Sequence, residues 1–417
     1  MQNQIVTFGC RLNIYESEVI RDNLARSGVE NAIVFNTCAV TSEAERQARQ
    51  AIRKARRENP DKQIIVTGCA AQINPQKYSD MPEVDNVLGN QEKLEKASYL
   101  NLDGEKSKVN DIMELQETAL HMVDSYDGKT RAFLQIQNGC NHRCTFCIIP
   151  FGRGNNRSVP VGDIISHAKQ LVERGFREIV LTGVDITDYG LDLPGRPTLG
   201  NLAKRMLKMI PDLARLRLSS IDPKEVDDEV FELLANEKRF MPHLHISLQA
   251  GDDMILKRMK RRHLRADVVD FVARARSLRE DVVFGADIIA GFPTETDDMF
   301  ENTKNLISEL GLTHLHIFPY SEREGTPAAK IPNQVPKKIR KERAAILRAE
   351  GEIQMQRLLE SRVGKTEKVL IESENKGHTE QFLPVQISGY EVGEIVELEI
   401  SGTHETSLRA NRVSVAI

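Results

Sequence analysis

Short apolar runs alternate with longer charged stretches of helical period over most of this chain, and this alternation limits the fold more than any other feature. Up to about residue 125, the runs that predict strands are residues 4–8, 32–35, 63–66 and 86–88. Stretches of helical period cover residues 15–27 and 42–57, and another begins near residue 91. Strands separated in this way by helices form βαβ units with a parallel sheet. We therefore expect an α/β protein with an amino-terminal Rossmann-like parallel sheet.

Polar residues mark the predicted start of two of these helices. Ser42 with Glu45 has the Ser-x-x-Glu spacing of a capping box, and Asn13 with Glu16 has a weaker version of it. The pattern predicts that both helices begin a few residues after a cysteine.

A second alternating series follows a polar stretch, residues 101–130, which we interpret as a linker or a connecting hairpin. The strand candidates of this series are residues 132–136, 178–181, 213–219, 243–248, 282–289 and 314–318. A helical stretch follows each of them but the last. Six such β/α units predict a partial (β/α)6 barrel of TIM type, in which the chemistry takes place at the carboxyl ends of the strands.

The end of the chain changes character. Residues 337–360 predict a basic helix, and residues 369–371, 383–387 and 395–400 alternate like the strands of a small β-barrel. At roughly 150 residues per domain, 417 residues predict about three domains. We place these domains at residues 1–125, 126–360 and 361–417.

The expected compartment determines how the six cysteines are interpreted. No stretch approaches the roughly 18 unbroken apolar residues of a membrane span, and the first eight residues lead into a strand pattern without a signal segment. We expect a cytoplasmic protein without membrane association. In that compartment, cysteines are reduced ligands or catalysts more often than disulfides.

Cys140, Cys144 and Cys147 lie within eight residues, directly after a predicted strand. A loop at this place can fold three thiolates around one centre. Structural zinc takes four protein ligands, and the nearest candidate for the fourth, His142, lies inside the loop. A 4Fe-4S cluster on three cysteines leaves one iron open to a substrate or cofactor. Cysteines that only fill space would not need spacing this specific.

This Cys-x3-Cys-x-Phe-Cys segment, with Phe146 in the aromatic position, resembles the signature of the radical S-adenosylmethionine superfamily. The resemblance implies that the open iron binds S-adenosylmethionine. One electron from the cluster then cleaves this cofactor to methionine and a 5′-deoxyadenosyl radical. The resemblance also implies cofactor contacts at later strand ends, from Gly183, Asp185, Ser220, Gln249 and Ile289.

The other three cysteines, Cys10, Cys38 and Cys69, each follow a predicted strand and precede a predicted helix. The carboxyl ends of parallel strands meet at one edge of a sheet, so the three can converge there. Positive partial charge at nearby helix N-termini favours thiolate ligands. From position alone, convergence and coincidental burial are equally good interpretations.

From residue 4 to about residue 400, the chain resembles the methylthiotransferases, which combine a three-cysteine domain, a radical S-adenosylmethionine domain and a TRAM domain. The motifs that carry this resemblance are Gly-Cys-Arg-Leu-Asn-x-Tyr-Glu-Ser-Glu at 9–18, Asn-Thr-Cys-Ala-Val-Thr at 36–41, Val-Thr-Gly-Cys-Ala-Ala-Gln at 66–72 and Phe-Cys-Ile-Ile-Pro-x-Gly-Arg-Gly at 146–154. The resemblance implies a second 4Fe-4S cluster, on Cys10, Cys38 and Cys69, that carries or supplies sulfur. The implied reaction uses one S-adenosylmethionine to methylate sulfur and a radical from another to abstract hydrogen, so that C–H becomes C–S–CH3.

Three branches of this family act on different substrates: isopentenyladenosine in tRNA, N6-threonylcarbamoyladenosine next to the anticodon, and an aspartate of a ribosomal protein. Residues 10–18 and 148–154 resemble the threonylcarbamoyladenosine branch most, which makes the 2-methylthio derivative. Leu12 stands where the isopentenyl branch usually has Met. The other two branches stay open as alternatives, and so does a non-enzymatic, zinc-bearing RNA-binding module.

Three basic runs, at residues 46–57, 257–265 and 337–343, favour tRNA as the partner although the net charge of the chain is −4. A solvated helix face is an equally good interpretation of any one run. The TRAM-like end is acidic, since residues 362–417 carry six Lys and Arg against nine Asp and Glu. An acidic domain suits a basic ribosomal protein better than tRNA.

Further expectations concern contacts and partners. Arg153 and Arg157, just past the three-cysteine loop, are candidate substrate contacts, and surface cations are an equally good interpretation of both. The resemblance implies a reducing partner such as flavodoxin or ferredoxin, and we expect a monomer. The sequence does not identify the sulfur donor.

Overall fold

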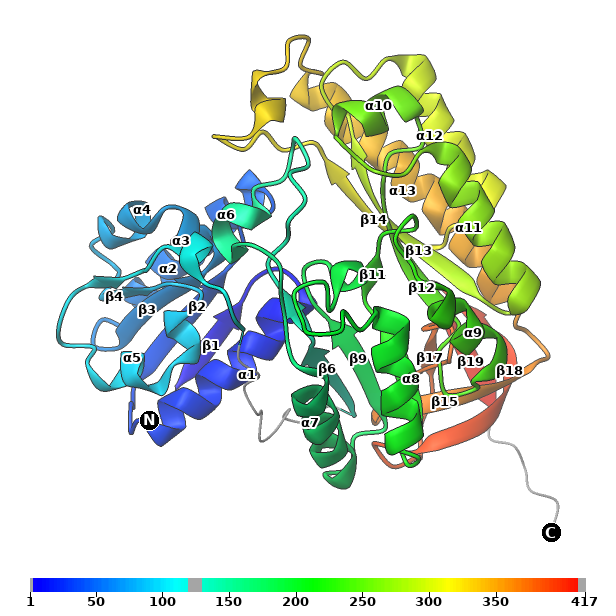
Figure 1. The fold of residues 1–417 in the computed structure, drawn as a ribbon, viewed down its shortest axis with the longest axis horizontal. Helices are drawn as coiled ribbons and strands as arrows, with labels where there is room; N and C mark the ends of the chain where they lie inside the picture. Colours follow the sequence, from blue (N-terminus) through cyan, green and yellow to red (C-terminus); the bar gives the residue numbers. More distant parts are fainter. Residues whose placement is uncertain (1–2, 119–129, 412–417) are drawn as a thin grey trace.

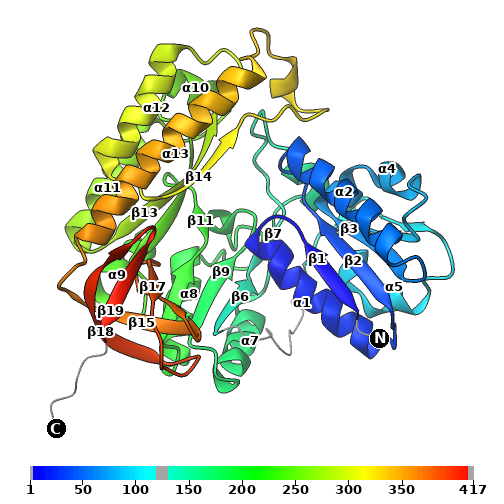
Figure 2. The same cartoon turned by 180° about the vertical axis from the view of Figure 1, so that it is seen from behind.

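The computed structural model describes residues 3–118 and 130–411, which form three parts (Figure 1). A parallel sheet near the amino terminus and a small closed barrel near the carboxyl terminus flank a central, partial barrel, and the view from behind shows the same order (Figure 2). Among the described residues, no helix has the length and apolar character needed to span a membrane.

The amino-terminal sheet has five parallel strands in the order β1-β2-β3-β4-β5. They are β1 (Gln4–Thr7), β2 (Ala32–Thr37), β3 (Gln63–Gly68), β4 (Asn86–Leu88) and β5 (Ser107–Lys108). Helices α1 (Arg11–Arg26) and α5 (Lys96–Leu100) cover one face, and α2 (Ser42–Glu58) and α4 (Pro75–Ser79) cover the other. Every residue of β2 is therefore buried. The expected parallel sheet is confirmed, and its sequential order places the ends of β1, β2 and β3 side by side.

The polar stretch after residue 100 contains more structure than a linker. Strand β5 pairs with β4, and the short helix η2 (Ile112–Glu114) follows it. The helix expected from residue 91 is two short pieces, η1 (Glu92–Leu94) and α5. The predicted domain boundary at residue 125 lies outside the described residues.

The capping predictions were wrong at both helices. Thr41, rather than Ser42, is the N-cap of α2, because its Oγ1 accepts a hydrogen bond from the amide of Ala44 at 3.1 Å. Helix α1 begins directly after Cys10 without a side-chain cap. Asn13 and Glu16 therefore lie inside α1, where both are buried.

We expect Thr41→Ala to lower the free energy of unfolding by about 1 kcal/mol, because the first turn of α2 loses its acceptor. Urea unfolding followed by circular dichroism measures this loss. Ser42→Ala is the matched control and should have a smaller effect, since the hydroxyl of the exposed Ser42 caps no helix and makes only long hydrogen bonds, of 3.2–3.4 Å, to Ser321, Glu322 and Arg323. Equal losses in the two variants would contradict the assignment of Thr41 as the cap.

Six parallel strand positions form the central barrel, with β6 and β14 as its two edges. The strands are β6 (Arg131–Gln135), β9 (Glu178–Thr182), β10 (Arg215–Leu218) with its continuation β11 (Ser220–Ile221), β12 (His243–Gln249), β13 (Val283–Ala290) and β14 (His314–Pro319). β10 pairs with β9 and β11 pairs with β12, so this interrupted strand joins two sheets. The partial (β/α)6 barrel is confirmed.

Helices cover the outside of the central barrel (Figure 1). They are α7 (Val161–Glu173), α8 (Leu199–Met209), α9 (Asp228–Asn236), α11 (Arg265–Leu278), α12 (Asp297–Leu310) and α13 (Lys337–Glu360), the last being the expected basic helix. Smaller elements lie in the connections: β7 (Gln137–Asn138), β8 (Arg157–Ser158), α6 (Ile149–Arg153), α10 (Asp253–Arg258), α3 (Cys69–Ile73), η3 (Ile186–Asp188) and η4 (Pro327–Lys330). Helix α1 packs against β6, because Leu12 and Tyr15 belong to the same hydrophobic cluster as Ala132 and Leu134.

The carboxyl-terminal barrel is closed, in the strand order β15-β16-β17-β19-β18. Its strands are β15 (Thr366–Ser373), β16 (Lys376–His378), β17 (Pro384–Gln386), β18 (Ile395–His404) and β19 (Ser407–Asn411). Val369, Leu383, Leu398 and Leu408 fill its core. The expected small β-barrel is confirmed.

Phe382 joins this closed barrel to the amino ends of the central strands. The ring of His378 stacks on it at 4.6 Å, and the guanidinium carbons of Arg131 and Arg217 lie 4.6 and 5.1 Å from its centroid. Arg215 donates to the carbonyl oxygen of His378 at 3.2 Å. The acidic closed barrel thus faces arginines at the base of the central barrel, opposite the strand ends at which the chemistry is expected.

Candidate functional site

Cys10, Cys38 and Cys69 lie in adjacent loops at the carboxyl edge of the amino-terminal sheet. These loops can approach closely because Gly9, directly before Cys10, and Gly68, directly before Cys69, have no side chain. A Cβ on Gly9 would lie 2.9 Å from the Sγ of Cys38, and both glycines have a φ near +100°, at 100° and 95°. The structure therefore brings the three cysteines together.

Asn13, in the first turn of α1, holds two of these loops in place. Its Nδ2 donates to the carbonyl oxygen of Phe8 at 2.6 Å and to that of Thr37 at 3.2 Å. Its Oδ1 accepts from Arg153 at 2.6 Å. This asparagine therefore links the three-cysteine edge to the segment that follows Cys147.

A buried ion network surrounds Cys69. Arg153, on α6, is 1% exposed, and its Nε donates to the Sγ of Cys69 at 3.0 Å. Its two terminal nitrogens bind Glu16, which also accepts from Lys93 at 2.6 Å. Burial raises the pKa of the Glu16 carboxyl, but Arg153 and Lys93 outweigh it and hold that pKa below its usual range. The carboxylate charge of Glu16 also raises the pKa of Arg153, whereas burial lowers the pKa of Lys93.

The environment of these sulfurs suits metal-bound thiolates. Cys69 receives N–H donors from Arg153 and, at 3.8 Å, from Asn90, as a negatively charged sulfur requires. Burial raises the pKa of Cys38 to about 12, so a free thiol there would keep its proton at neutral pH. A metal ion that replaces the proton removes this cost. The donor set therefore fits an iron–sulfur cluster.

The second group, Cys140, Cys144 and Cys147, lies in a loop fastened to the carboxyl face of the central barrel. Within this loop, the amide of Thr145 donates to the carbonyl oxygen of Met259 at 3.0 Å. Burial raises the pKa of Cys147 to about 12. The second group therefore resembles the first, since its three thiols lie close together. As with Cys38, a free thiol at Cys147 would keep its proton at neutral pH, and a bound metal would replace that proton.

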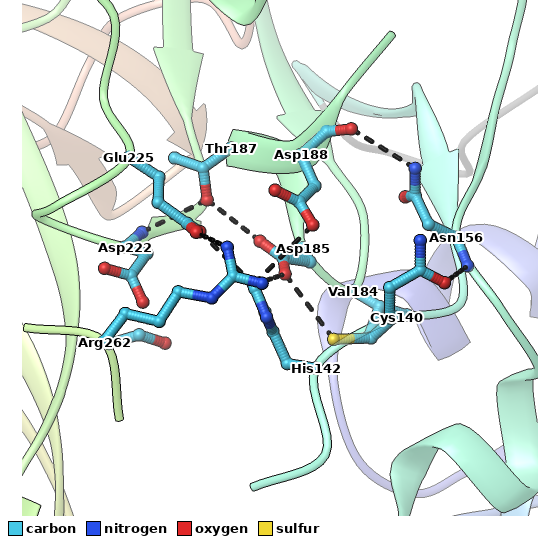
Figure 3. A network of polar contacts seen from close by, with 12 residues as sticks. Cys140, His142, Asn156, Val184, Asp185, Thr187, Asp188, Asp222, Glu225 and Arg262 are labelled. Atoms are coloured by element: carbon cyan, nitrogen blue, oxygen red, sulfur yellow. Dashed lines mark hydrogen bonds and ion pairs between the residues drawn. The ribbon is translucent and has the colours of Figure 1, made fainter. Parts of the chain in front are cut away.

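His142, the candidate fourth zinc ligand, turns toward three carboxylates instead (Figure 3). Its Nε2 lies 2.9 Å from Asp185, 3.2 Å from Glu225 and 3.6 Å from Asp188. The hydrogen bond with Asp185 raises the pKa of His142 and favours the imidazolium, which cannot bind a metal. The geometry argues against zinc on three cysteines and this histidine.

Gly183 and Asp185 follow β9 on the same face of the barrel. A Cβ on Gly183 would lie 2.6 Å from the Oε1 of Gln137, which also accepts from the amides of Val184 and Asp185 at 2.9 Å. Gly183 thus permits a tight turn. This turn brings the carboxylate of Asp185 to 3.5 Å from the Sγ of Cys140.

Ser220, Gln249 and Ile289 lie at the carboxyl ends of the neighbouring strands β11, β12 and β13. Ser220 donates to the Oδ2 of Asp287 at 3.4 Å. Gln249 has a φ of 69°, and the register of β12 against β13 shifts just before it. Phe146 and Ile289 pack against one hydrophobic cluster. The structure therefore places all the expected cofactor contacts on the face that carries the second cysteine group.

Arg153 and Arg157 differ from their expected description as substrate contacts. They are 1% and 3% exposed. The guanidinium of Arg153 donates to Cys69, Glu16 and Asn13. That of Arg157 donates to the carbonyl oxygens of Asn155 and Arg153, at 2.9 and 3.0 Å. Both guanidinium groups already bind protein, so the structure argues against the predicted substrate contact.

Sequence reasoning missed the residues that support the cysteines. Arg261 donates to the Sγ of Cys144 at 3.5 Å and to Asp222 at 2.8 Å, but its place in a basic run concealed this role. The sequence did contain a signal for the role of Glu16. This glutamate lies on the same helical face as the apolar residues Leu12, Tyr15 and Val19, and a charge on a buried face requires a partner of opposite charge.

The basic runs are mostly neutralised. In residues 46–57 every basic residue except Arg57 pairs with a carboxylate. In the other two runs, Lys257, Lys260, Lys337 and Lys341 are exposed and have no ion pair within residues 3–118 and 130–411. Arg57 and these four lysines are therefore the exposed cations of the three runs that have no ion pair in the described ranges.

Comparison with known proteins gives the class first. The model of the "Radical SAM superfamily" matches residues 134–307, which contain the second cysteine group and the strand ends, and that of "Uncharacterized protein family UPF0004" matches residues 2–89. A solved structure of the radical S-adenosylmethionine methyltransferase TsrM from Kitasatospora setae shares the fold, with a TM-score of 0.57 and 14% identity over 79% of this chain and 77% of that one.

Relatives of known name narrow the class. The chain is 59% identical to the threonylcarbamoyladenosine tRNA methylthiotransferase MtaB of Rickettsia prowazekii, over 97% of this chain and 96% of that protein. It is 36% identical to the enzyme of the same name from Aquifex aeolicus, over 94% of this chain and 98% of that protein. The chain belongs to the threonylcarbamoyladenosine tRNA methylthiotransferase family.

Proposed function

We propose that this enzyme converts N6-threonylcarbamoyladenosine next to the tRNA anticodon to its 2-methylthio derivative. One observation carries the proposal: Arg153, six residues after Cys147, binds the sulfur of Cys69, so a single short segment joins two three-cysteine groups. A methylthiotransferase needs both groups near one substrate atom. The relatives named above support the choice of substrate.

The proposed ligands follow from this arrangement. Cys140, Cys144 and Cys147 hold one 4Fe-4S cluster, and Cys10, Cys38 and Cys69 hold the other. The clusters and S-adenosylmethionine supply the radical chemistry and the methyl group when bound. Phe146, Gly183, Asp185, Ser220, Gln249 and Ile289 form the proposed contact surface for S-adenosylmethionine. Arg153 and Arg261 each hold one cluster ligand by a hydrogen bond to its sulfur.

The remaining parts of the proposal concern partners. Lys257, Lys260, Lys337 and Lys341 contact tRNA phosphates, because they are exposed and unpaired within the described residues. The enzyme works in the cytoplasm as a monomer and takes electrons from a protein such as flavodoxin or ferredoxin. Residues 1–125, 126–360 and 361–417 are its three domains, and the last is TRAM-like.

We expect deletion of the gene to remove 2-methylthio-threonylcarbamoyladenosine from total tRNA, and the intact gene to restore it. Nucleoside mass spectrometry measures both. Complementation with a Cys38→Ala gene is the matched control and should not restore the product. Loss of the isopentenyl product instead would assign the enzyme to that sister branch. Unchanged tRNA would contradict the proposal and direct the search to the ribosomal protein.

A further inference from the structure

Arg11 follows Cys10 directly and is the first residue of α1. Its side chain is half-buried, and within residues 3–118 and 130–411 it makes no hydrogen bond or ion pair. A guanidinium has five N–H donors and seeks a planar anion such as a carboxylate. A partly buried arginine without a partner, next to an expected cluster ligand, therefore calls for a ligand from outside the chain.

Arg11 lies where α1 meets the central barrel. Its neighbours at the seam, Leu12 and Tyr15, pack into the hydrophobic cluster of the barrel, and α1 lies between the amino-terminal sheet and β6 (Figure 1). The charges that act on Arg11 most strongly are on barrel strands: Arg131, Arg217, Asp287 and Glu178.

The two nearby acids are already used by other groups. Glu178 pairs with Arg217 at 2.7 Å, with Arg215 at 3.7 Å and with Arg131 at 3.8 Å. Asp287 binds His245 at 3.1 Å and His316 at 3.0 Å. Neither carboxylate pairs with Arg11 within residues 3–118 and 130–411. The guanidinium of Arg11 therefore keeps its donors for an anion from outside the chain.

The proposed substrate carries such an anion at a suitable place. The threonyl group of N6-threonylcarbamoyladenosine ends in a carboxylate, whereas the isopentenyl group of the sister substrate has no charge. In adenine, C2 and N6 lie on the same edge, on either side of N1. If C2 of the base lies between the two cysteine groups, the N6 substituent can extend past Cys10 toward Arg11, the residue that follows it.

We infer that Arg11 binds the threonyl carboxylate of the substrate and selects threonylcarbamoyladenosine over uncharged N6-modified adenosines. This inference rests on the proposed function and deepens it. Arg11 is thus a specificity residue: it touches the substituent, at a distance from the carbon that receives sulfur.

The test changes the substrate as well as the protein. Two synthetic anticodon stem-loops carry threonylcarbamoyladenosine either as the free acid or as its methyl ester, and the reconstituted holoenzyme converts them under single-turnover conditions. We expect the single-turnover rate constant of the wild type, measured at subsaturating enzyme, to be roughly 10- to 100-fold lower on the ester, the usual effect of a lost charge-assisted hydrogen bond. Arg11→Gln should lose as much on the acid and should discriminate less than about threefold between the two.

Matched variants separate recognition from damage to the cluster. Arg11→Lys keeps the charge and should recover part of the discrimination. Arg21→Gln, on the same helix, removes an exposed arginine and should discriminate as the wild type does. Iron and acid-labile sulfide are measured in every variant, because Arg11 adjoins Cys10. Equal rates of the wild type on acid and ester overturn the inference, and so does full discrimination by Arg11→Gln. Conversion of an isopentenyl stem-loop alone would instead overturn the proposed function.

Discussion

Cys144→Ala is expected to abolish reductive cleavage of S-adenosylmethionine, whereas Cys38→Ala should retain cleavage and stop only the insertion of sulfur. Cys144 belongs to the loop on the barrel face, where it accepts from Arg261, while Cys38 lies across the interface in the amino-terminal sheet. Each substitution removes a ligand from one group and leaves the other complete. Production of 5′-deoxyadenosine and of methylthio nucleoside, both by mass spectrometry, measures the two half-reactions.

Iron content checks the same division of labour independently. The wild type should hold about eight irons per chain, and each single variant about four. Equal loss of cleavage in Cys38→Ala and Cys144→Ala would contradict separate roles for the two groups. Bound zinc in a colourless wild-type protein would favour the non-enzymatic RNA-binding module.

Arg153→Met is expected to lower the free energy of unfolding by about 3–5 kcal/mol, the usual cost of breaking a buried ion pair from one side. Glu16 would keep only Lys93 as a partner, and Cys69 would lose its closest donor. The variant should therefore also lose iron from the amino-terminal group. Denaturant unfolding under anaerobic conditions, with iron analysis of the folded protein, measures both effects.

Arg46→Met is the matched control for this variant. Arg46 pairs with a glutamate as Arg153 does, but its partner, Glu43, lies on the same helix and the pair is exposed. Exposed pairs contribute little, so we expect no measurable change. Arg153→Lys retains the charge without the planar fork and should fall between the two. A loss in Arg153→Met no larger than that in Arg46→Met would show that the buried network does not hold the two parts together.

The alternation of strands and helices was sufficient to predict the main architecture, because burial of a parallel sheet imposes long apolar runs between helices. Elements without such a run were missed. Strand β5 has only two residues, Ser107 and Lys108, and neither is apolar. The N-cap of α2 was placed one residue late, since Thr41 and Ser42 can both accept a hydrogen bond and only the backbone decides between them.

The cysteines could be predicted as site candidates because each group follows strands whose ends must meet at one edge. Their supporting residues could not, since the contacts depend on how two separate parts pack. Glu16 and Arg153 are 137 residues apart in the chain, and no local pattern connects them. Arg153 looked like a surface cation next to a loop. Its burial follows only from the docking of α6 against the three-cysteine edge.

The stacking of Phe382 at the base of the central barrel makes the carboxyl-terminal barrel part of the catalytic body and not a tethered arm. Its acidic strands can face arginines there, and the sign of its net charge consequently says little about the affinity of the whole enzyme for RNA. Natural or engineered exchange of this domain between relatives would have to preserve the stacked rings of His378 and Phe382, which contact the arginines of the central barrel. The outward surface of the same domain is free to diverge.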